Sequence, residues 1–139
     1  MSIPAVMPTD VVRFPQAENA VMDLTLYNEV DFFCSYIWED NTEAGIDLTG
    51  ISFDFKVRRR AESATVYIHL TDVPVGEEGI WILSPTPPYQ VGSFVLYIKR
   101  DRLQSITPAE YVQSLICLRT GVWTRIWGGK FSLNWGVSR

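Results

Sequence analysis

The sequence has few of the residue types from which catalytic and metal sites are built. It contains one histidine, His69, and two cysteines, Cys34 and Cys117, among 139 residues. A structural zinc site takes four ligands, mostly Cys and His, and a single histidine cannot supply such a set. No serine lies in the G-x-S-x-G pattern of a nucleophile elbow. We therefore expect no enzyme activity, no metal site and no cofactor.

Positive charge and long apolar runs are also scarce. The net charge is −4 and the isoelectric point is near 4.9, whereas nucleic-acid binding depends on clustered Lys and Arg that displace counterions. The apolar runs are far shorter than the roughly 20 residues of a membrane helix, and no basic-then-apolar export signal opens the chain. We expect a protein without a nucleic-acid partner or membrane insertion. Its cysteines are expected to be free thiols, although a sandwich can bring two strand cysteines together.

The residues that are abundant favour β-structure in a single domain. Apolar residues make up 47% of the chain and aromatic residues 13%, a composition that leans toward sheet. The stretch 47–60, DLTGISFDFKVRRR, alternates strictly between apolar and polar residues after a turn signal. Successive side chains of a strand point to opposite faces, so one face of this strand is expected to be buried. That face carries Ile51, Phe53, Phe55 and Val57.

Similar short runs, separated by Gly, Pro, Asn and Asp turns, recur along residues 23–139. They predict an all-β, antiparallel, immunoglobulin-like β-sandwich of about 7–9 strands. Residues 101–106 predict one short helical turn that ends before Pro108. Thr120 and Gly121 predict a tight turn between the last two long strands. Gly128 and Gly129 predict a bulge or bend in the final strand.

Residues 1–22 are predicted to form an extended N-terminal arm outside the sandwich domain of residues 23–139. Three prolines oppose a helix in this segment. Two interpretations stay open: a terminus without fixed structure, or an arm that packs on a neighbouring subunit. The second interpretation rests on the apolar residues of the arm, which are Ile3, Val6, Val11, Val12 and Phe14.

Two further groups are candidates for partner binding. Arg58, Arg59 and Arg60 end a predicted strand, where they either hold an acidic partner through forked hydrogen bonds or discourage edge pairing. In the last strand, the alternation places Trp123, Arg125 and Trp127 on one face. That face is either a surface rich in the residue types of interface hot spots or part of the core. The acidic residues of the turns are expected to be solvated rather than to bind calcium, because the calcium-loop spacing is missing.

The order of several short motifs resembles a group of small virion proteins of tailed phages and prophages, akin to the N-terminal domain of upper baseplate proteins. The resemblance covers about residues 30–139 and includes DLTG at 47–50, PAEYVQSL at 108–115, TRIWGGKFSL at 124–133 and the closing VSR. The matching positions are Asp47, Leu48, Thr49, Gly50, Val57, Arg58, Tyr111, Val112, Leu115, Thr124, Arg125, Ile126, Gly129 and Arg139.

This resemblance implies an immunoglobulin-like sandwich and a structural role without catalysis. The expected protein is a tail, baseplate or fibre-attachment component that is present in multiple copies, assembles in the bacterial cytoplasm and binds other virion proteins. A capsid decoration protein is an alternative from the same class. A carbohydrate-binding module for host attachment, with sugars stacked on exposed tryptophans, is the alternative from a different class.

Overall fold

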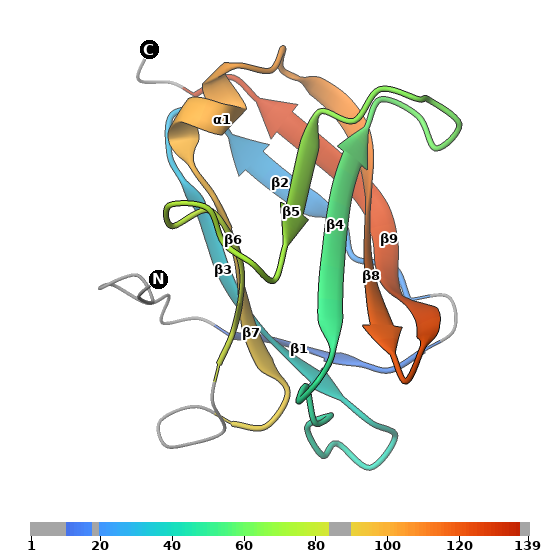
Figure 1. The fold of residues 1–139 in the computed structure, drawn as a ribbon. Coiled ribbons are helices and arrows are strands. Elements are labelled where there is room, and N and C mark those ends of the chain that lie inside the picture. The colour runs from blue at the N-terminus through green and yellow to red at the C-terminus, as the bar shows by residue number, and fades with distance from the viewer. Residues whose placement is uncertain (1–10, 18–19, 84–89, 137–139) are drawn as a thin grey trace.

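The computed structural model describes residues 11–17, 20–83 and 90–136, which form two facing β-sheets (Figure 1). The four-stranded sheet has the order β1 (Val11–Pro15), β3 (Phe32–Glu39), β7 (Ser93–Ile98) and β6 (Gly79–Ile82). The five-stranded sheet has the order β2 (Leu24–Tyr27), β9 (Val122–Asn134), β8 (Ala109–Arg119), β4 (Ser52–Arg58) and β5 (Ile68–Thr71). The prediction of an all-β, sandwich-like fold is confirmed.

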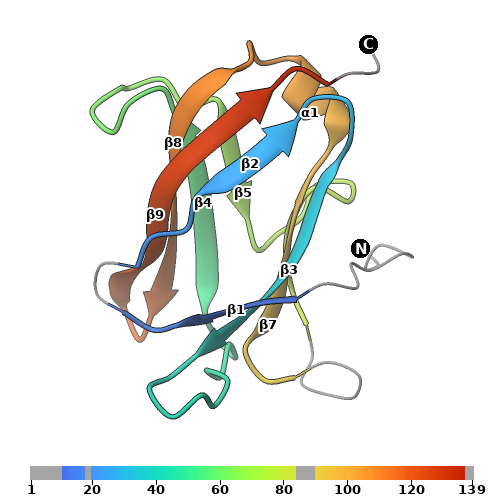
Figure 2. The same cartoon turned by 180° about the vertical axis from the view of Figure 1, so that it is seen from behind.

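Both sheets are mixed, whereas the sequence predicted antiparallel strands throughout. β1 pairs with β3 in parallel, and β2 pairs with β9 in parallel. The other strand pairs are antiparallel. Figure 2 shows how the chain crosses from β1 in one sheet to β2 in the other, where β2 lies beside the C-terminal strand. The two N-terminal strands thus account for both parallel pairs.

The core lies between the sheets and follows from the alternation in the strands. The predicted inner face of the 47–60 stretch is confirmed, since Ile51, Phe53, Phe55 and Val57 are all buried. In β7 both faces are buried, because Val95 and Tyr97 belong to a second apolar cluster on the outer side of the four-stranded sheet. β7 is therefore a central strand with two covered faces.

Part of the predicted N-terminal arm belongs to the sandwich. Residues 11–15 form the edge strand β1, and Pro15 ends this strand, a position where the missing N–H costs no central ladder bond. Phe14 is only 6% exposed and makes edge-on ring contacts with Tyr36 and Trp127 at centroid distances of 6.2 and 5.2 Å. Phe14 thus packs on its own chain, whereas the arm interpretation placed it on a neighbouring subunit. The predicted contacts of Ile3 and Val6 lie outside the described residues.

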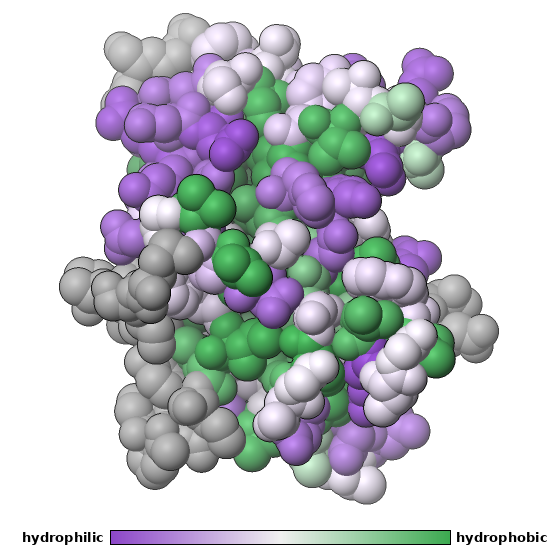
Figure 3. Space-filling view, in the orientation of Figure 1, coloured by the Kyte–Doolittle hydropathy of each residue, from purple (hydrophilic) through white to green (hydrophobic). Residues whose placement is uncertain are grey.

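The predicted turn and helix are both found. Thr120 and Gly121 have φ values of 48° and 79° and join β8 to β9, which is the two-residue geometry that suits a twisted hairpin. The helix α1 (Arg100–Gln104) lies at one end of the sandwich and buries Leu103. Figure 3 shows hydrophilic residues over α1, at the upper left of the view. Within α1, Arg102 forms a salt bridge with Glu78 at 2.8 Å.

Candidate docking surface

The last strand changes its inward-facing side at a β-bulge. Leu115 of β8 is paired with Trp127 of β9, but the next β8 residue, Ile116, is paired with Arg125. Ile126 is therefore the extra residue, and both Ile126 and Trp127 are buried. The bulge was predicted at Gly128 and Gly129 and lies two residues earlier. A bulge shifts the alternation by one residue. The inward-facing residues of β9 are therefore even-numbered up to Ile126 and odd-numbered from Trp127 onward.

The bulge separates the residues that the sequence placed on one face. Trp123 is 56% exposed, while Trp127 is fully buried. Arg125 is also exposed. The surface interpretation therefore holds for Trp123 and Arg125, and the core interpretation holds for Trp127.

Trp127 lies in an aromatic cluster at the centre of the core. Its ring is 4.9 Å from that of Tyr36 and 6.1 Å from that of Phe94. Its indole N–H donates to Oε1 of Gln113 at 2.7 Å, and the Gln113 amide N–H2 donates to the Met22 carbonyl. Gln113 is a buried polar residue whose hydrogen-bonding groups are satisfied by these contacts. Trp127 is thus a structural residue and not a docking residue.

The outward side chains of β4, β8 and β9 form what we call the outer sheet face. The pairing registers place them in cross-strand rows: Ser52, Leu118 and Trp123; Asp54, Ile116 and Arg125; Lys56, Ser114 and Gly128; Arg58, Val112 and Lys130. The β8 residues in the middle of these rows are half-buried and mostly aliphatic. Cations lie on both sides of them. The face therefore combines an apolar centre with charged flanks.

Of the two carboxylates of this face, Glu110 is in a salt bridge with Lys130, whereas Oδ1 of Asp54 is buried without a hydrogen-bond partner among the described residues. Asp54 lies 3.1 Å from Nε2 of His69, and Glu110 lies 3.7 Å from Nζ of Lys130. Within the described ranges, no carboxylate forms a salt bridge with Lys56, Arg58 or Arg125. The Nε of Arg58 is buried and has no hydrogen-bond partner there. The face thus carries uncompensated positive charge on a chain whose net charge is −4.

The three consecutive arginines have different environments. Arg58 belongs to the outer sheet face. Arg59 donates a hydrogen bond to the Glu110 carbonyl and its guanidinium lies 5.3 Å from the centre of the Tyr111 ring. Arg60 is exposed in a turn after β4. Burial raises the pKa of Tyr111, the nearby Tyr67 adds to this shift, and the Arg59 charge opposes it. Arg59 therefore contributes to packing at the strand end.

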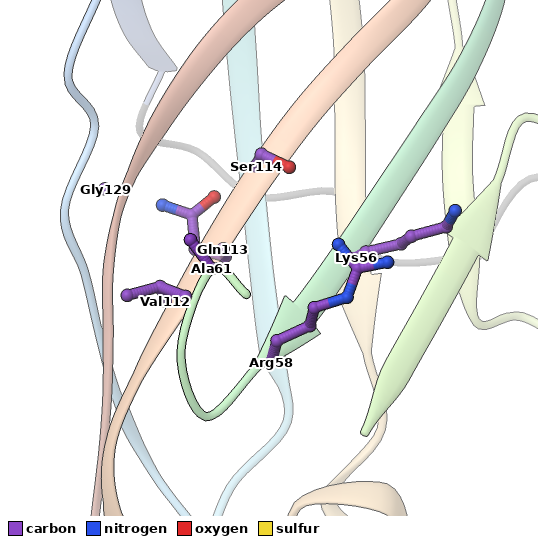
Figure 4. A pocket seen from close by; sticks show the side chains of 7 residues that line it. All are labelled: Lys56, Arg58, Ala61, Val112, Gln113, Ser114 and Gly129. Atoms are coloured by element: carbon purple, nitrogen blue, oxygen red, sulfur yellow. The ribbon is translucent and has the colours of Figure 1, made fainter. Parts of the chain in front are cut away.

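A cavity of about 460 Å³ opens beside the cations. It is lined by Lys56, Arg58, Ala61, Val112, Gln113, Ser114 and Gly129. Figure 4 shows the side chains of Lys56 and Arg58 over β4, Ser114 on β8 and Gly129 on β9. The sequence prediction included Arg58 but missed Lys56 and Ser114. The alternation of the 47–60 stretch, which already places Lys56 and Arg58 on one face, was the signal that could have found Lys56.

The candidate residues of β1 lie in the other sheet. Val11 and Val12 are 46% and 38% exposed, and the next residue of β1, Arg13, forms a salt bridge with Glu39 of β3 at 2.8 Å. The structure therefore does not bring the β1 residues together with those of the outer sheet face. Val11 and Val12 therefore belong to a second surface, separate from the outer sheet face.

The two cysteines lie in different sheets, Cys34 in β3 and Cys117 in β8. Cys34 is half-buried, Cys117 is buried, and neither forms a disulfide. Among the residues that the structure describes, no three His, Cys, Asp or Glu side chains gather in a way that could hold a metal ion. The search for a long apolar helix, made on the same residues, finds none that could cross a bilayer.

Comparisons with known proteins give a similarity in fold. No protein-family model matches the sequence, and no curated protein matches it. Among solved structures, the chain is similar to the N-terminal domain of phage TP901-1 ORF48, with a TM-score of 0.48 and 11% sequence identity. The match covers 89% of this chain and 96% of that chain.

Proposed function

We propose that the chain is a non-enzymatic structural protein of a phage virion, located in the tail, the baseplate or a fibre attachment. It assembles in multiple copies in the bacterial cytoplasm and binds other virion proteins. The order of motifs between residues 47 and 139 supports the phage assignment. The immunoglobulin-like description of the sandwich is part of this proposal and is supported by its two facing sheets.

The observation that carries the docking role is the outer sheet face. Trp123 is exposed there, although a tryptophan side chain gains free energy from burial. Arg125 lies two residues away, and Trp and Arg are the types enriched in interface hot spots. The aliphatic residues of β8 continue this surface between the strands. An apolar centre with a polar rim is the anatomy of a protein interface.

Immunogold electron microscopy tests the location. Antibodies against the chain are applied to phage particles from the strain that encodes it, and we expect gold particles at the tail or its distal end. Particles of a phage from which this gene has been deleted serve as the control. Gold on the capsid would favour the decoration alternative, and unlabelled particles would refute a virion location.

The assembly part of the proposal is tested on the purified chain. Light scattering coupled to size exclusion is expected to show a defined oligomer, which Trp123→Ala with Arg125→Ala weakens if the outer sheet face contributes. The exposed β1 residues Val11 and Val12 are tested in the same way, with both changed to Ser. An oligomer unaffected by either pair would assign assembly to other residues.

Carbohydrate binding is the second candidate, and the exposure of Trp123 favours it. A tryptophan ring offers an apolar face and a polar N–H, which together suit a sugar ring. On a glycan array, this hypothesis expects selective binding that Trp123→Ala abolishes. An array without binding, together with a stable oligomer, would favour assembly.

A further inference from the structure

We propose that Lys56, Arg58 and Arg125 form a carboxylate-binding cluster that docks an extended acidic segment of a partner protein. The inference rests on the docking role proposed above and names the chemistry of the partner. It differs from the arginine triplet of the sequence, because Arg59 packs on Tyr111. The structure adds Lys56, and it places Arg125, which the sequence predicted in a separate group, on the same face as Arg58.

The position of Arg125 is set by a glycine. A Cβ added to Gly128 would lie 2.1 Å from Nη2 of Arg125 and 2.8 Å from its Cζ. The guanidinium therefore occupies the space above Gly128, where any larger residue would displace it. Gly128 is paired with Ser114. The Arg125 side chain thus lies along β9, over the residue that is paired with Ser114.

The other two cations approach the same place from β4. Lys56 is paired with Ser114 from the side opposite Gly128, and Arg58 is paired with Val112, the outward neighbour of Ser114 on β8. Paired residues in adjacent strands lie about 5 Å apart, so two strand spacings separate the backbone of Lys56 from that of Gly128. Lys56 and Arg58 therefore flank the Ser114 row from β4, and Arg125 flanks it from β9, where its guanidinium lies over Gly128. The cavity of about 460 Å³ contains this serine together with Lys56 and Arg58 in its lining.

The three cations have no salt-bridge partner in the described part of the chain, and an acidic partner would supply one. Like charges placed close together repel, and each lacks a carboxylate in the described part of the chain. The buried Nε of Arg58 has no acceptor there, and such a donor costs free energy until an acceptor reaches it. A carboxylate accepts bidentate hydrogen bonds from a guanidinium. An acidic segment supplies both the acceptors and the negative charge.

An extended segment fits this surface better than a folded one. The half-buried side chains of β8 run in a line from Val112 through Ser114 to Ile116 and Leu118. A strand-like peptide along this line would bring alternate side chains to the cations, since its own period is two residues. Its other contacts would be made with the aliphatic residues. Trp123 lies at the end of this line, opposite Leu118.

Binding of hexaglutamate, labelled with a fluorophore, to the full chain tests the proposal by anisotropy. We expect saturable binding that weakens as salt rises from 50 to 500 mM, because salt screens charge pairs. Arg58→Gln and the double variant Lys56→Gln/Arg125→Gln should each weaken binding about tenfold or more, and tenfold corresponds to about 1.4 kcal/mol. The matched controls are Arg100→Gln and Lys99→Gln/Arg100→Gln, which remove the same number of charges beside α1, outside the outer sheet face, and should change the affinity less than twofold.

A variant that keeps every charge separates the cluster from net charge. Gly128→Ala is expected to move the Arg125 guanidinium off its place and to weaken hexaglutamate binding, although the net charge is unchanged. Circular dichroism verifies that each variant is folded. Equal losses in the cluster variants and the controls, or no binding to the unchanged chain, would overturn the proposal.

The probes also separate the proposed partner from other anions. Tighter binding of a labelled hexathymidylate than of hexaglutamate would overturn the assignment to carboxylates in favour of phosphates. Failure of this proposal is distinguishable from failure of the proposed function. Labelled phage tails without hexaglutamate binding refute only the acidic partner, whereas binding without labelled particles refutes only the virion location.

Discussion

The two tryptophans on either side of the bulge should differ sharply in their effect on stability. Trp127 is fully buried and Trp123 is 56% exposed, although both were expected on one face of the strand. Replacement by phenylalanine is the sharpest test, because it keeps an aromatic ring and removes the indole N–H. Trp123→Phe is the matched control for Trp127→Phe.

The magnitude for Trp127→Phe has two sources. Loss of the 2.7 Å hydrogen bond leaves Oε1 of Gln113 buried without this donor, which costs about 1–3 kcal/mol. The smaller ring also leaves space in the aromatic cluster, and lost buried groups of this size cost on the order of 1 kcal/mol. We expect the free energy of unfolding to fall by about 2–4 kcal/mol. For Trp123→Phe we expect a change within about 0.5 kcal/mol, as for other surface substitutions.

Urea unfolding followed by far-ultraviolet circular dichroism measures both values by linear extrapolation. Acrylamide quenching gives an independent readout, since Trp123→Phe should remove part of the accessible tryptophan emission and Trp127→Phe should not. Equal losses of stability in the two variants, or a larger loss for Trp123→Phe, would refute the bulge at Ile126 and the assignment of the two faces.

Three further predictions concern the backbone, the first strand and pH. Gly129→Ala should lower the free energy of unfolding by about 1–3 kcal/mol, because its Cβ would lie 2.5 Å from the Met22 carbonyl oxygen. In Gly128→Ala the flexible end of Arg125 can move away, so the free energy of unfolding measured in urea should change little. Phe14→Ala should cost about 3–5 kcal/mol in the same assay, and a cost below 1 kcal/mol would show that β1 is not part of the core. Burial raises the pKa of Tyr97 to about 12, and the hydrogen bond and charge of Asp31 add to this shift. The folded state therefore holds the phenol proton at pH values above the unfolded pKa of about 10. The contribution of this proton to stability is complete below pH 10 and is lost between pH 10 and 12. Absorbance titration at 295 nm checks the Tyr97 pKa, with Tyr97→Phe as the control.

Local patterns predicted the parts of the fold that depend on neighbouring residues. The alternation in residues 47–60 placed four apolar side chains on the buried face, because strand geometry assigns the faces directly. The pair Thr120–Gly121 predicted its turn for a similar reason, since both residues adopt positive φ. These features need no knowledge of distant segments.

The parallel pairs could not be predicted in this way. The partners of β1 and β2 are β3 and β9, and for β2 the partner is more than 100 residues away. Nothing within a four-residue strand records the direction of such a partner. Gly129 illustrates the same limit: its lack of a side chain is required by the approach of Met22 before β2. From the sequence, the glycine indicated an irregular strand, but its cause lay in a distant segment.

The bulge connects the core to the candidate docking surface. Without the extra residue Ile126, one alternation would run through all of β9. A strand with that alternation that buries Trp127, Phe131 and Leu133 would also turn Trp123 and Arg125 toward the core. The bulge turns that half of the strand by one position, so that a single strand supplies aromatic residues to the core and a tryptophan and an arginine to the surface. Arg125 then lies over Gly128, the outward residue just beyond the bulge. The arrangement that places Arg125 over Gly128 therefore depends on the same irregularity that keeps Trp127 in the core, and a change to the bulge would alter both.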